Sequence, residues 1–316
     1  MSMNRNRLIV DTDGGVDDAQ ALVMLIGNGW VPAAITTVFG NVSLQSATDN
    51  ILAILATLKA SVPVYRGADR PLIGDAIDAK YVHGDDGLGG APRPERQDEP
   101  QAMHAVDFLR TELAQATRTE PVDLLMIGPL TNLALALRLD PDCAKGIGTL
   151  YIMGGTVKGR GNVTPAAEFN FYADPESASI VLSAGIATVL VPWESCTEHM
   201  MTGTELDDAF AGLPTIGAPG FSLALSQHLR RNAQSRGRGD VMLFVDPLAS
   251  AVMLDPSMIE TATDAAIEIE LSAGPARGMS IIDPAGRIRA SNVRIVESVD
   301  NRKLAELFRR SIAYAP

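Results

Sequence analysis

The stretch LIVDTDGGVDDAQALVML spans residues 8–25 and shows in miniature how the chain is built. Its apolar residues 8–10 form a strand pattern that stops at Asp11. Gly14 and Gly15 permit a tight turn, and a helical pattern follows over 19–27. A strand, a short turn and a helix in succession are the opening of a βαβ unit, so the stretch predicts a parallel sheet covered by helices.

The same alternation continues along the chain. Further strands are predicted at 33–39, 62–65, 122–127, 149–153 and 188–191, with helices at 45–59, 102–116, 131–137 and 175–184. Beyond residue 200 we expect helices near 222–232 and 247–253, strands near 266–271 and 293–299, and a helix from residue 302. These patterns predict an α/β fold: a doubly wound, mostly parallel, Rossmann-like sheet with additional C-terminal helices and a small strand pair, in one domain over 1–316.

The composition excludes several classes of protein. Of the 316 residues, 46% are hydrophobic and 20% are charged, which is typical of a globular protein. A formal net charge of −12, with no basic stripe among aromatic residues, argues against nucleic acid as a partner. No apolar run approaches the roughly 18 residues that a membrane span needs.

The N-terminal region and the cysteines indicate the compartment. The apolar run at 8–10 is far too short for the core of a signal peptide. Cys143 and Cys196 lack the spacing of a zinc site and are predicted to be free thiols. We therefore expect a soluble, cytoplasmic protein.

Four carboxylates fall within eight residues of the opening stretch: Asp11, Asp13, Asp17 and Asp18. A parallel sheet places them at the carboxyl end of its first strand, where such folds bind ligands. Like charges this close raise one another's pKa unless a cation neutralises them, and oxygen ligands favour Ca²⁺ or Mg²⁺. Alternatively, Asp17 and Asp18 only complement a helix dipole while Asp13 decorates the turn.

Two other interpretations of the acidic stretch fit the chain less well. An EF-hand loop requires a glutamate where this chain has Leu22, and it follows a helix where this chain has a strand. A phosphotransferase of the haloacid dehalogenase type also has a strand that ends in Asp-x-Asp-Gly. The chain shows no convincing set of that family's later motifs.

Other polar segments are predicted to reach the same rim of the sheet. FGN at 39–41, IGPLTN at 127–132 and MGG at 153–155 each end a predicted strand. Asn162, Glu168 and Asn170 bring two amides and a carboxylate together, a group that suits sugar hydroxyls. The polar segment 67–101 is too long for an ordinary connection and is a candidate lid.

These motifs together resemble the nucleoside hydrolase family. The resemblance rests on DTDGGVDDAQAL, FGN, HGDDGLGG, IGPLTNLA, MGG, GNVTPAAEFNFYADPESA and VDPLA, which occur in family order from Asp11 to Ala249. It implies a calcium-dependent N-ribohydrolase of the inosine-uridine preferring type. Such an enzyme hydrolyses the N-glycosidic bond of a ribonucleoside to ribose and free base.

The resemblance also implies roles for individual residues. Asp13 would be the general base that takes a proton from a calcium-bound water. The implied calcium ligands are Asp13, Asp18, the Ile127 carbonyl and Asp246. The implied ribose-binding residues are Asp17, Asn41, Asn162, Glu168 and Asn170, with Asp11 as support behind them. Relatives commonly form homodimers or homotetramers, so a homo-oligomer is expected.

The chain departs from the family pattern at Val245. Many relatives carry histidine or tryptophan just before the late aspartate, where it protonates or stacks on the leaving base. Valine does neither, so His83 is the expected catalytic residue facing the base. His228, Arg236 and Arg238 are weaker candidates for contact with the base, and His104 and His199 are expected to be structural. Trp193 and Glu194 are expected on the same rim.

The departure at Val245 keeps a second function open. A protein with the complete metal and sugar set but no group to activate the base would bind ribose or a nucleoside with calcium and turn it over weakly or not at all.

Overall fold

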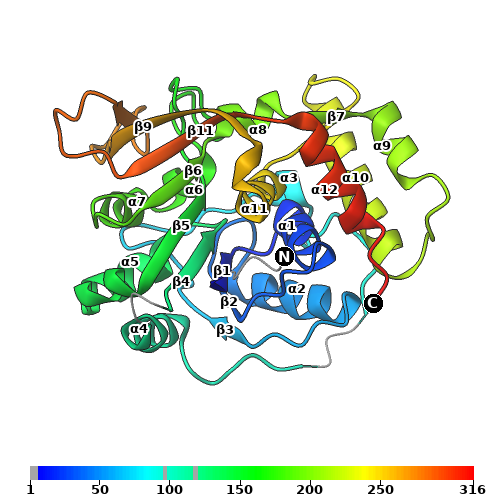
Figure 1. The fold of residues 1–316 in the computed structure, drawn as a ribbon, viewed down its shortest axis with the longest axis horizontal. Helices are drawn as coiled ribbons and strands as arrows, with labels where there is room; N and C mark the ends of the chain where they lie inside the picture. Colours follow the sequence, from blue (N-terminus) through cyan, green and yellow to red (C-terminus); the bar gives the residue numbers. More distant parts are fainter. Residues whose placement is uncertain (1–5, 95–97, 117–119) are drawn as a thin grey trace.

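A nine-stranded sheet forms the centre of the molecule in the residues that the structure, a computed structural model, describes: 6–94, 98–116 and 120–316. The sheet joins both halves of the chain, with the orange strands near one edge and blue strands near the other (Figure 1). Its strands, in spatial order, are β10 (Ser280–Asp283), β9 (Ile259–Ile269), β11 (Val293–Val299), β6 (Thr188–Val191), β5 (Ile147–Met153), β4 (Val122–Met126), β1 (Arg7–Thr12), β2 (Ala34–Thr37) and β3 (Val64–Arg66).

The strand order is that of a doubly wound sheet. From β3 to β6 the order is 3-2-1-4-5-6, and all neighbouring pairs in this part run parallel. Within the nine-stranded sheet of the described residues, only β9 runs antiparallel to both of its neighbours, β10 and β11. The order reverses between β1 and β4, and a crevice opens at the carboxyl ends of strands at such a point. The predicted fold class is confirmed.

Helices cover both faces of the sheet. One face packs against α1 (Val16–Gly27), α2 (Leu44–Thr57), α10 (Gly217–Ser235), α11 (Asp246–Leu254) and α12 (Asn301–Ile312). The opposite face packs against α4 (Ala105–Gln115), α5 (Thr131–Leu139) and α7 (Pro175–Leu182). Along β1, Leu8 and Val10 enter the first core and Ile9 the second, as the period of two in a strand requires.

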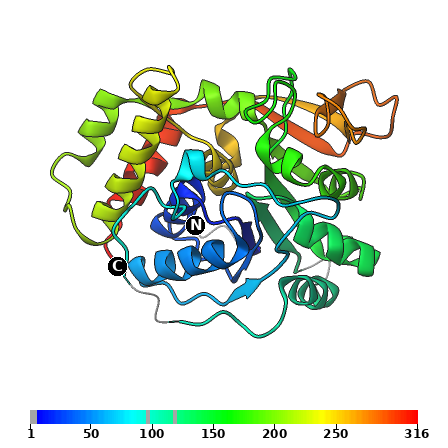
Figure 2. The ribbon, with the colours of Figure 1, turned by 180° about the vertical axis from the view of Figure 1, so that it is seen from behind.

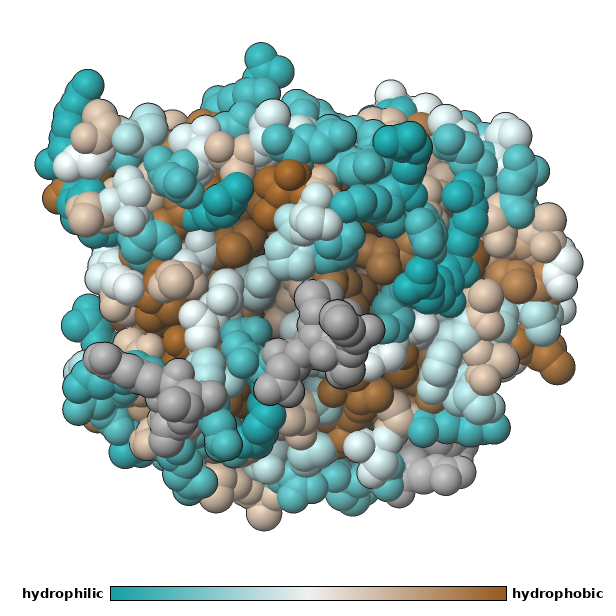
Figure 3. Space-filling view, in the orientation of Figure 1, coloured by the Kyte–Doolittle hydropathy of each residue, from teal (hydrophilic) through white to brown (hydrophobic). Residues whose placement is uncertain are grey.

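The last helix closes the first core. The ring of Phe308 in α12 meets the ring of Phe244 edge-on, with centroids 5.3 Å apart, and the ring of Phe210 at 6.1 Å. Leu304 and Ile312 lie on the same buried face of the helix, and its arginines lie on the other. Figure 3 shows that outer face as a hydrophilic band beside hydrophobic residues. The amphipathic pattern from residue 302 thus docks α12 against α1.

The late strands differ from the expected arrangement. The strands predicted near 266–271 and 293–299 are β9 and β11, and both join the main sheet. The small strand pair is formed instead by β7 (Met200–Thr202) and β8 (Val241–Leu243), which no periodic pattern marked. Strands of three residues are too short to show alternation.

Several short helices also lacked a sequence signal: α3 (Lys80–His83), α6 (Phe169–Ala173), α8 (Trp193–Glu198) and α9 (Gly203–Phe210). Within the long 67–101 segment, α3 and a bridge between Tyr65 and Gln101 give local order, and residues 95–97 lie outside the described residues. Both cysteines are buried free thiols, as expected. Every described helix is too short or too polar to cross a membrane.

The turn after β1 depends on a glycine that contacts α2. Gly14 has φ +69°, and a Cβ built there would lie 2.6 Å from Ala47 Cα and 2.9 Å from its carbonyl oxygen. Gly29 has a similar φ of +79°, yet a Cβ there would meet nothing within 4 Å. The two positions therefore share a positive φ, which strains any residue with a side chain, but they differ in the space around a Cβ.

We predict that Gly29→Ala lowers the free energy of unfolding by about 1 kcal/mol, the cost of a positive φ. Gly14→Ala should lower it by about 2–4 kcal/mol, because α2 must also move. Urea denaturation of both variants measures the difference. Equal losses would show that the contact with α2 adds nothing.

Candidate active site

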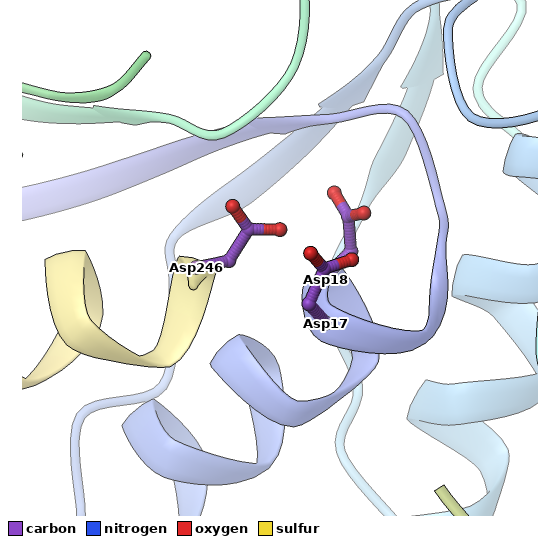
Figure 4. Close-up of side chains that lie close together, drawn as sticks. All are labelled: Asp17, Asp18 and Asp246. Carbon is purple, nitrogen blue, oxygen red and sulfur yellow. The ribbon is translucent and has the colours of Figure 1, made fainter. Parts of the chain in front are cut away.

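Three buried carboxylates meet at the carboxyl edge of the sheet. Asp17 and Asp18 come from the first turn of α1, and Asp246 begins α11, which arrives from the other half of the chain. One oxygen of each lies within 4.8 Å of the others, and Figure 4 shows the side chains pointing toward one another. Burial and the charges of Asp17 and Asp18 raise the pKa of Asp246 well above its usual range.

Asp18 is held by the turn that precedes it. Its carboxylate accepts hydrogen bonds from the Thr12 hydroxyl, from Asp13 N at 3.2 Å and from Gly15 N at 2.8 Å. These donors orient the side chain and fix the start of α1. Burial raises its pKa, with the charge of Asp17 as the next cause.

Asn41 joins Asp13 to Asp18. The Asn41 backbone N donates to Asp13 Oδ2 at 2.8 Å, and Nδ2 donates to Asp13 Oδ1 at 2.8 Å and to Asp18 Oδ2 at 2.9 Å. Burial and the charge of Asp18 raise the pKa of Asp13 well above its usual range. Asp13 is thus a buried carboxyl poised to hold a proton, next to the three-carboxylate group.

The carboxylate group and the expected calcium ligands overlap only in part. Asp18 and Asp246 belong to both sets, and Ile127 lines the adjoining pocket. Asp17, expected at the sugar, lies in the close group, whereas Asp13 faces Asn41. Asp17 Oδ1 is buried without a hydrogen-bond partner among the described residues. Three close carboxylates fit a hard divalent cation, and the unpartnered Asp17 oxygen is available to a ligand in the pocket.

Asp11 lies behind the site. Its Oδ2 accepts hydrogen bonds from the Thr36 hydroxyl at 2.5 Å and from Asn132 Nδ2 at 2.8 Å. Burial raises its pKa to about 7. Asp11 thereby ties β1 to β2 and to α5, which fits the supporting position expected for it.

Glu168 and Asn170 hold the start of α6 at the same rim. Glu168 Oε1 accepts from Asn170 N at 2.8 Å, and Oε2 accepts from Gly155 N at 2.9 Å. Asn170 Nδ2 donates to the carbonyls of Ile127 at 3.3 Å and Met153 at 3.2 Å. Burial raises the pKa of Glu168 to about 7. The side chains of these two residues thus fasten the loop after β5 to the ends of β4 and β5.

The pocket beside these groups is lined by two chemically different kinds of side chain. Its empty space is about 920 Å³, counting the solvent at its mouth. The acidic and amide lining residues are Asp17, Asn41, Asn162, Glu168, Asn170 and Asp246. The apolar and aromatic ones include Tyr81, Val82, Trp193, Leu229, Leu243 and Val245, and Arg236 and Arg238 line the pocket with them. Asn162 Oδ1 is buried and has no partner among the described residues, so the polar lining has an unused acceptor.

His83 contacts the acidic end of the pocket. Its Nδ1 accepts a hydrogen bond from Val16 N at 3.1 Å and lies 3.5 Å from Asp17 Oδ1. Burial lowers its pKa to about 4, so the ring is neutral at pH 7 with its proton on Nε2. His83 therefore has an N–H to donate but no imidazolium proton to give away.

The remaining histidines are tied to the backbone. His104 caps α4 by accepting from Val106 N, and buried His199 bonds Ser195 O and Val299 N, so both have the structural contacts expected. His228 Nε2 bonds the Val82 carbonyl at 2.8 Å, which joins α10 to α3. Figures 1 and 2 both place these two helices side by side.

Glu194 supports the loop that carries Asn162. Its carboxylate accepts from Val157 N at 2.9 Å and Lys158 N at 2.7 Å, while Trp193 beside it lines the pocket. Sequence reasoning missed Tyr81 and Asn232, which also line the pocket. One lies in a four-residue helix and the other in the middle of a long helix, so no local signal marked them.

The fold and site together define the class of protein: a doubly wound α/β protein whose switch point carries a buried acidic site suited to a metal ion. Residues 8–306 match the family model described as "Inosine-uridine preferring nucleoside hydrolase". The chain belongs to this family, whose members are N-glycosyl hydrolases acting on nucleosides.

Individual relatives agree with the match. The chain is 35% identical over 312 residues to a protein named "Non-specific ribonucleoside hydrolase RihC" from Klebsiella pneumoniae, covering 98% of this chain and 99% of that one. Among solved structures, a plant nucleoside hydrolase (PpNRh1) has a TM-score of 0.90 at 28% identity, covering 98% of this chain and 99% of that one. The structure of an inosine-guanosine nucleoside hydrolase has a TM-score of 0.88 at 30% identity, covering 99% of this chain and 100% of that one. The resemblance found in the sequence is confirmed.

The raised pKa of Glu168 predicts a pH effect on the metal-free protein. The folded state binds this proton more tightly than the unfolded chain, whose carboxyl has the ordinary value of 4.5. Its contribution to stability is therefore full below pH 4.5 and is lost as pH rises through about 7. Glu168→Gln removes this titration. The free energy of unfolding of the variant, relative to that of the wild type, should therefore rise by about 1–3 kcal/mol from pH 5 to pH 8.

Urea denaturation at both pH values, in a chelator, measures this gain. Exposed Glu260 provides the control, since Glu260→Gln should keep a constant offset from the wild type. A constant offset for Glu168→Gln as well would show that Glu168 titrates normally.

Proposed function

We propose that this protein hydrolyses the N-glycosidic bond of ribonucleosides with the help of calcium, giving ribose and free base. The observation that carries the proposal is a single pocket lined both by buried carboxylates and amides and by apolar and aromatic side chains. A ribose with its hydroxyls suits the first kind of lining and a flat base suits the second. The names of the relatives support the same reaction.

The proposed metal ligands are Asp18, Asp246, Asp13 and the Ile127 carbonyl. Asp17 lies on the pocket wall with a free oxygen and is proposed to meet a ribose hydroxyl. Calcium, when bound, supplies Lewis-acid chemistry that lowers the pKa of an adjacent water. It also neutralises the mutual repulsion of the carboxylates.

Asp13 is proposed as the general base. It is fully buried and held by two hydrogen bonds from Asn41, and its raised pKa suits a group that takes a proton from the attacking water. As the glycosidic bond breaks, positive charge develops on the ribosyl ring. Asp17, Glu168 and the amides of Asn162 and Asn170 then stabilise the transition state more than the ground state.

His83 is proposed to act as a neutral hydrogen-bond donor through Nε2–H. The hydrogen bond that Nδ1 accepts from Val16 N orients the ring beside Asp17. The low pKa of His83 and the presence of Val245 beside Asp246 favour the second candidate, a nucleoside-binding protein with weak turnover. That candidate requires nucleoside binding without release of reducing sugar.

A panel of ribonucleosides with calcium present, assayed for reducing sugar, tests the proposal. Release from at least one member is expected. Binding by calorimetry without release, unchanged in Val245→His, would favour the binding protein instead.

Asp13→Asn is predicted to lower kcat by about 10²–10⁴-fold, the usual contribution of a general base, because the amide cannot accept the proton. Circular dichroism should show an unchanged fold, since the amide keeps the size of the carboxyl. Exposed Asp208 in α9 gives the matched control, and Asp208→Asn should keep the wild-type kcat. A variant at Asp13 that kept most of its activity would exclude this residue as the base.

Calcium is predicted to raise the melting temperature of the chelator-treated protein. At a hundredfold excess over Kd, binding stabilises the folded state by about 2.7 kcal/mol. Asp246→Asn should abolish most of this increase, and in chelator it should melt no lower than the wild type because one repelling charge is gone. Asp208→Asn should respond to calcium like the wild type. An increase of full size in Asp246→Asn would remove Asp246 from the ligand set.

A further inference from the structure

Two arginines in the turn after α10 stand over aromatic rings that line the pocket. The guanidinium carbon of Arg238 lies 5.3 Å from the centroid of the Trp193 ring, and that of Arg236 lies 5.1 Å from the Tyr81 ring. All four residues line the pocket. Each pair is a cation–π contact, which holds the guanidinium plane in a defined place.

Arg238 has no carboxylate or hydrogen-bond partner among the described residues. The nearest acidic residue in sequence, Asp240, is occupied by Arg230, whose Nε and Nη2 donate to it at 2.5 Å and 2.7 Å. Desolvation by neighbouring groups, and next the charge of Arg236, lower the pKa of Arg238 below its usual range. Because Arg238 as a whole residue is exposed, its five N–H donors are open to a ligand.

The two kinds of lining residue suit the two parts of a nucleoside. With the ribose on the carboxylates and amides, the base is left to meet the other lining residues, among them Trp193, Val245 and Arg238. The apolar residues suit the faces of the base, and among the lining residues only the arginines carry a fork of parallel donors for its edge. A guanidinium accepts no hydrogen bond, so it selects an edge with two neighbouring acceptors.

Among the common bases, guanine and hypoxanthine present O6 and N7 as adjacent acceptors. Adenine carries an amino donor beside N7, and it would face the arginine donor to donor. Pyrimidines have no N7. The chemistry of the fork therefore separates 6-oxopurines from the other bases.

We propose that Arg238, stacked on Trp193, selects 6-oxopurine ribonucleosides by donating two hydrogen bonds to O6 and N7 of the base. This inference rests on the proposed function. When the bond between C1′ and N9 breaks, its electron pair leaves on the purine, and the negative charge spreads to N7 and O6, where the guanidinium meets it. The guanidinium keeps its proton.

The reaction balances without a general acid from the protein. Asp13 takes one proton from the attacking water, and the hydroxide part joins C1′. The departing purine takes a proton from solvent at the pocket mouth, and Asp13 returns its own to solvent. The sum is nucleoside plus water to ribose plus purine, so Arg238 replaces the missing acid by stabilising the leaving anion.

Steady-state kinetics of Arg238→Gln and Arg238→Lys with inosine, guanosine, adenosine and uridine test the proposal. Both variants should lose about 10- to 100-fold in kcat/KM for inosine and guanosine, the value of a bidentate contact, and should lose much less for adenosine and uridine. Lysine keeps the charge but not the fork, so it should not restore the preference. Arg231→Gln, at an exposed position of α10 away from the pocket, is the matched control.

Two further substrates separate this proposal from the proposed function. 7-Deazainosine lacks N7, so the wild type should have a lower kcat/KM for it than for inosine. This difference in kcat/KM should shrink in Arg238→Gln. p-Nitrophenyl riboside lacks O6 and N7, and its nitro oxygens lie at the far end of the ring, so the ratio of inosine to p-nitrophenyl riboside turnover should fall in the variant. If the wild type hydrolyses these substrates and the ratios do not change in Arg238→Gln, the role of Arg238 is overturned alone. If the wild type releases no ribose from any substrate, both proposals fall.

Discussion

Mutual repulsion of buried carboxylates is the constraint on which this structure depends. Asp13, Asp17, Asp18 and Asp246 are each buried, and each has its pKa raised by that burial. The chain offsets part of the repulsion with backbone N–H groups at the start of α1 and with the amide of Asn41. A bound cation would neutralise the repulsion that remains between the carboxylates. The folding of this region and its chemistry therefore depend on the same charges.

The sheet brings the distant parts of this cluster together. β1 lies between β2 and β4, so the turn after it faces Asn41 from beyond β2 and Ile127 from the end of β4. Asp246 reaches the cluster because α11 packs against α1 in the same core. An aspartate more than two hundred residues away in sequence is therefore placed within a few ångströms by helix packing.

Most of the sheet could be predicted from the sequence because each strand and helix has a local period. The acidic cluster was also visible, since its members are adjacent in sequence and follow a strand. Their arrangement was not, because Asp13 is held by Asn41 and lies outside the close group that Asp17 forms with Asp18 and Asp246. The position of His83 at the acidic end and the cation–π pairs likewise depend on how loops meet in space, and no local pattern encodes that.

The bond between His228 and the Val82 carbonyl has a consequence for how such a protein diversifies. It joins α3 to α10, two segments outside the sheet that both contribute residues to the pocket wall. The three close carboxylates come from α1 and α11 instead. Substitutions at pocket residues of α3 and α10 can therefore change the fit of the base while these carboxylates stay as they are. Selection can retune the choice of substrate in this architecture without rebuilding the machinery that cleaves it.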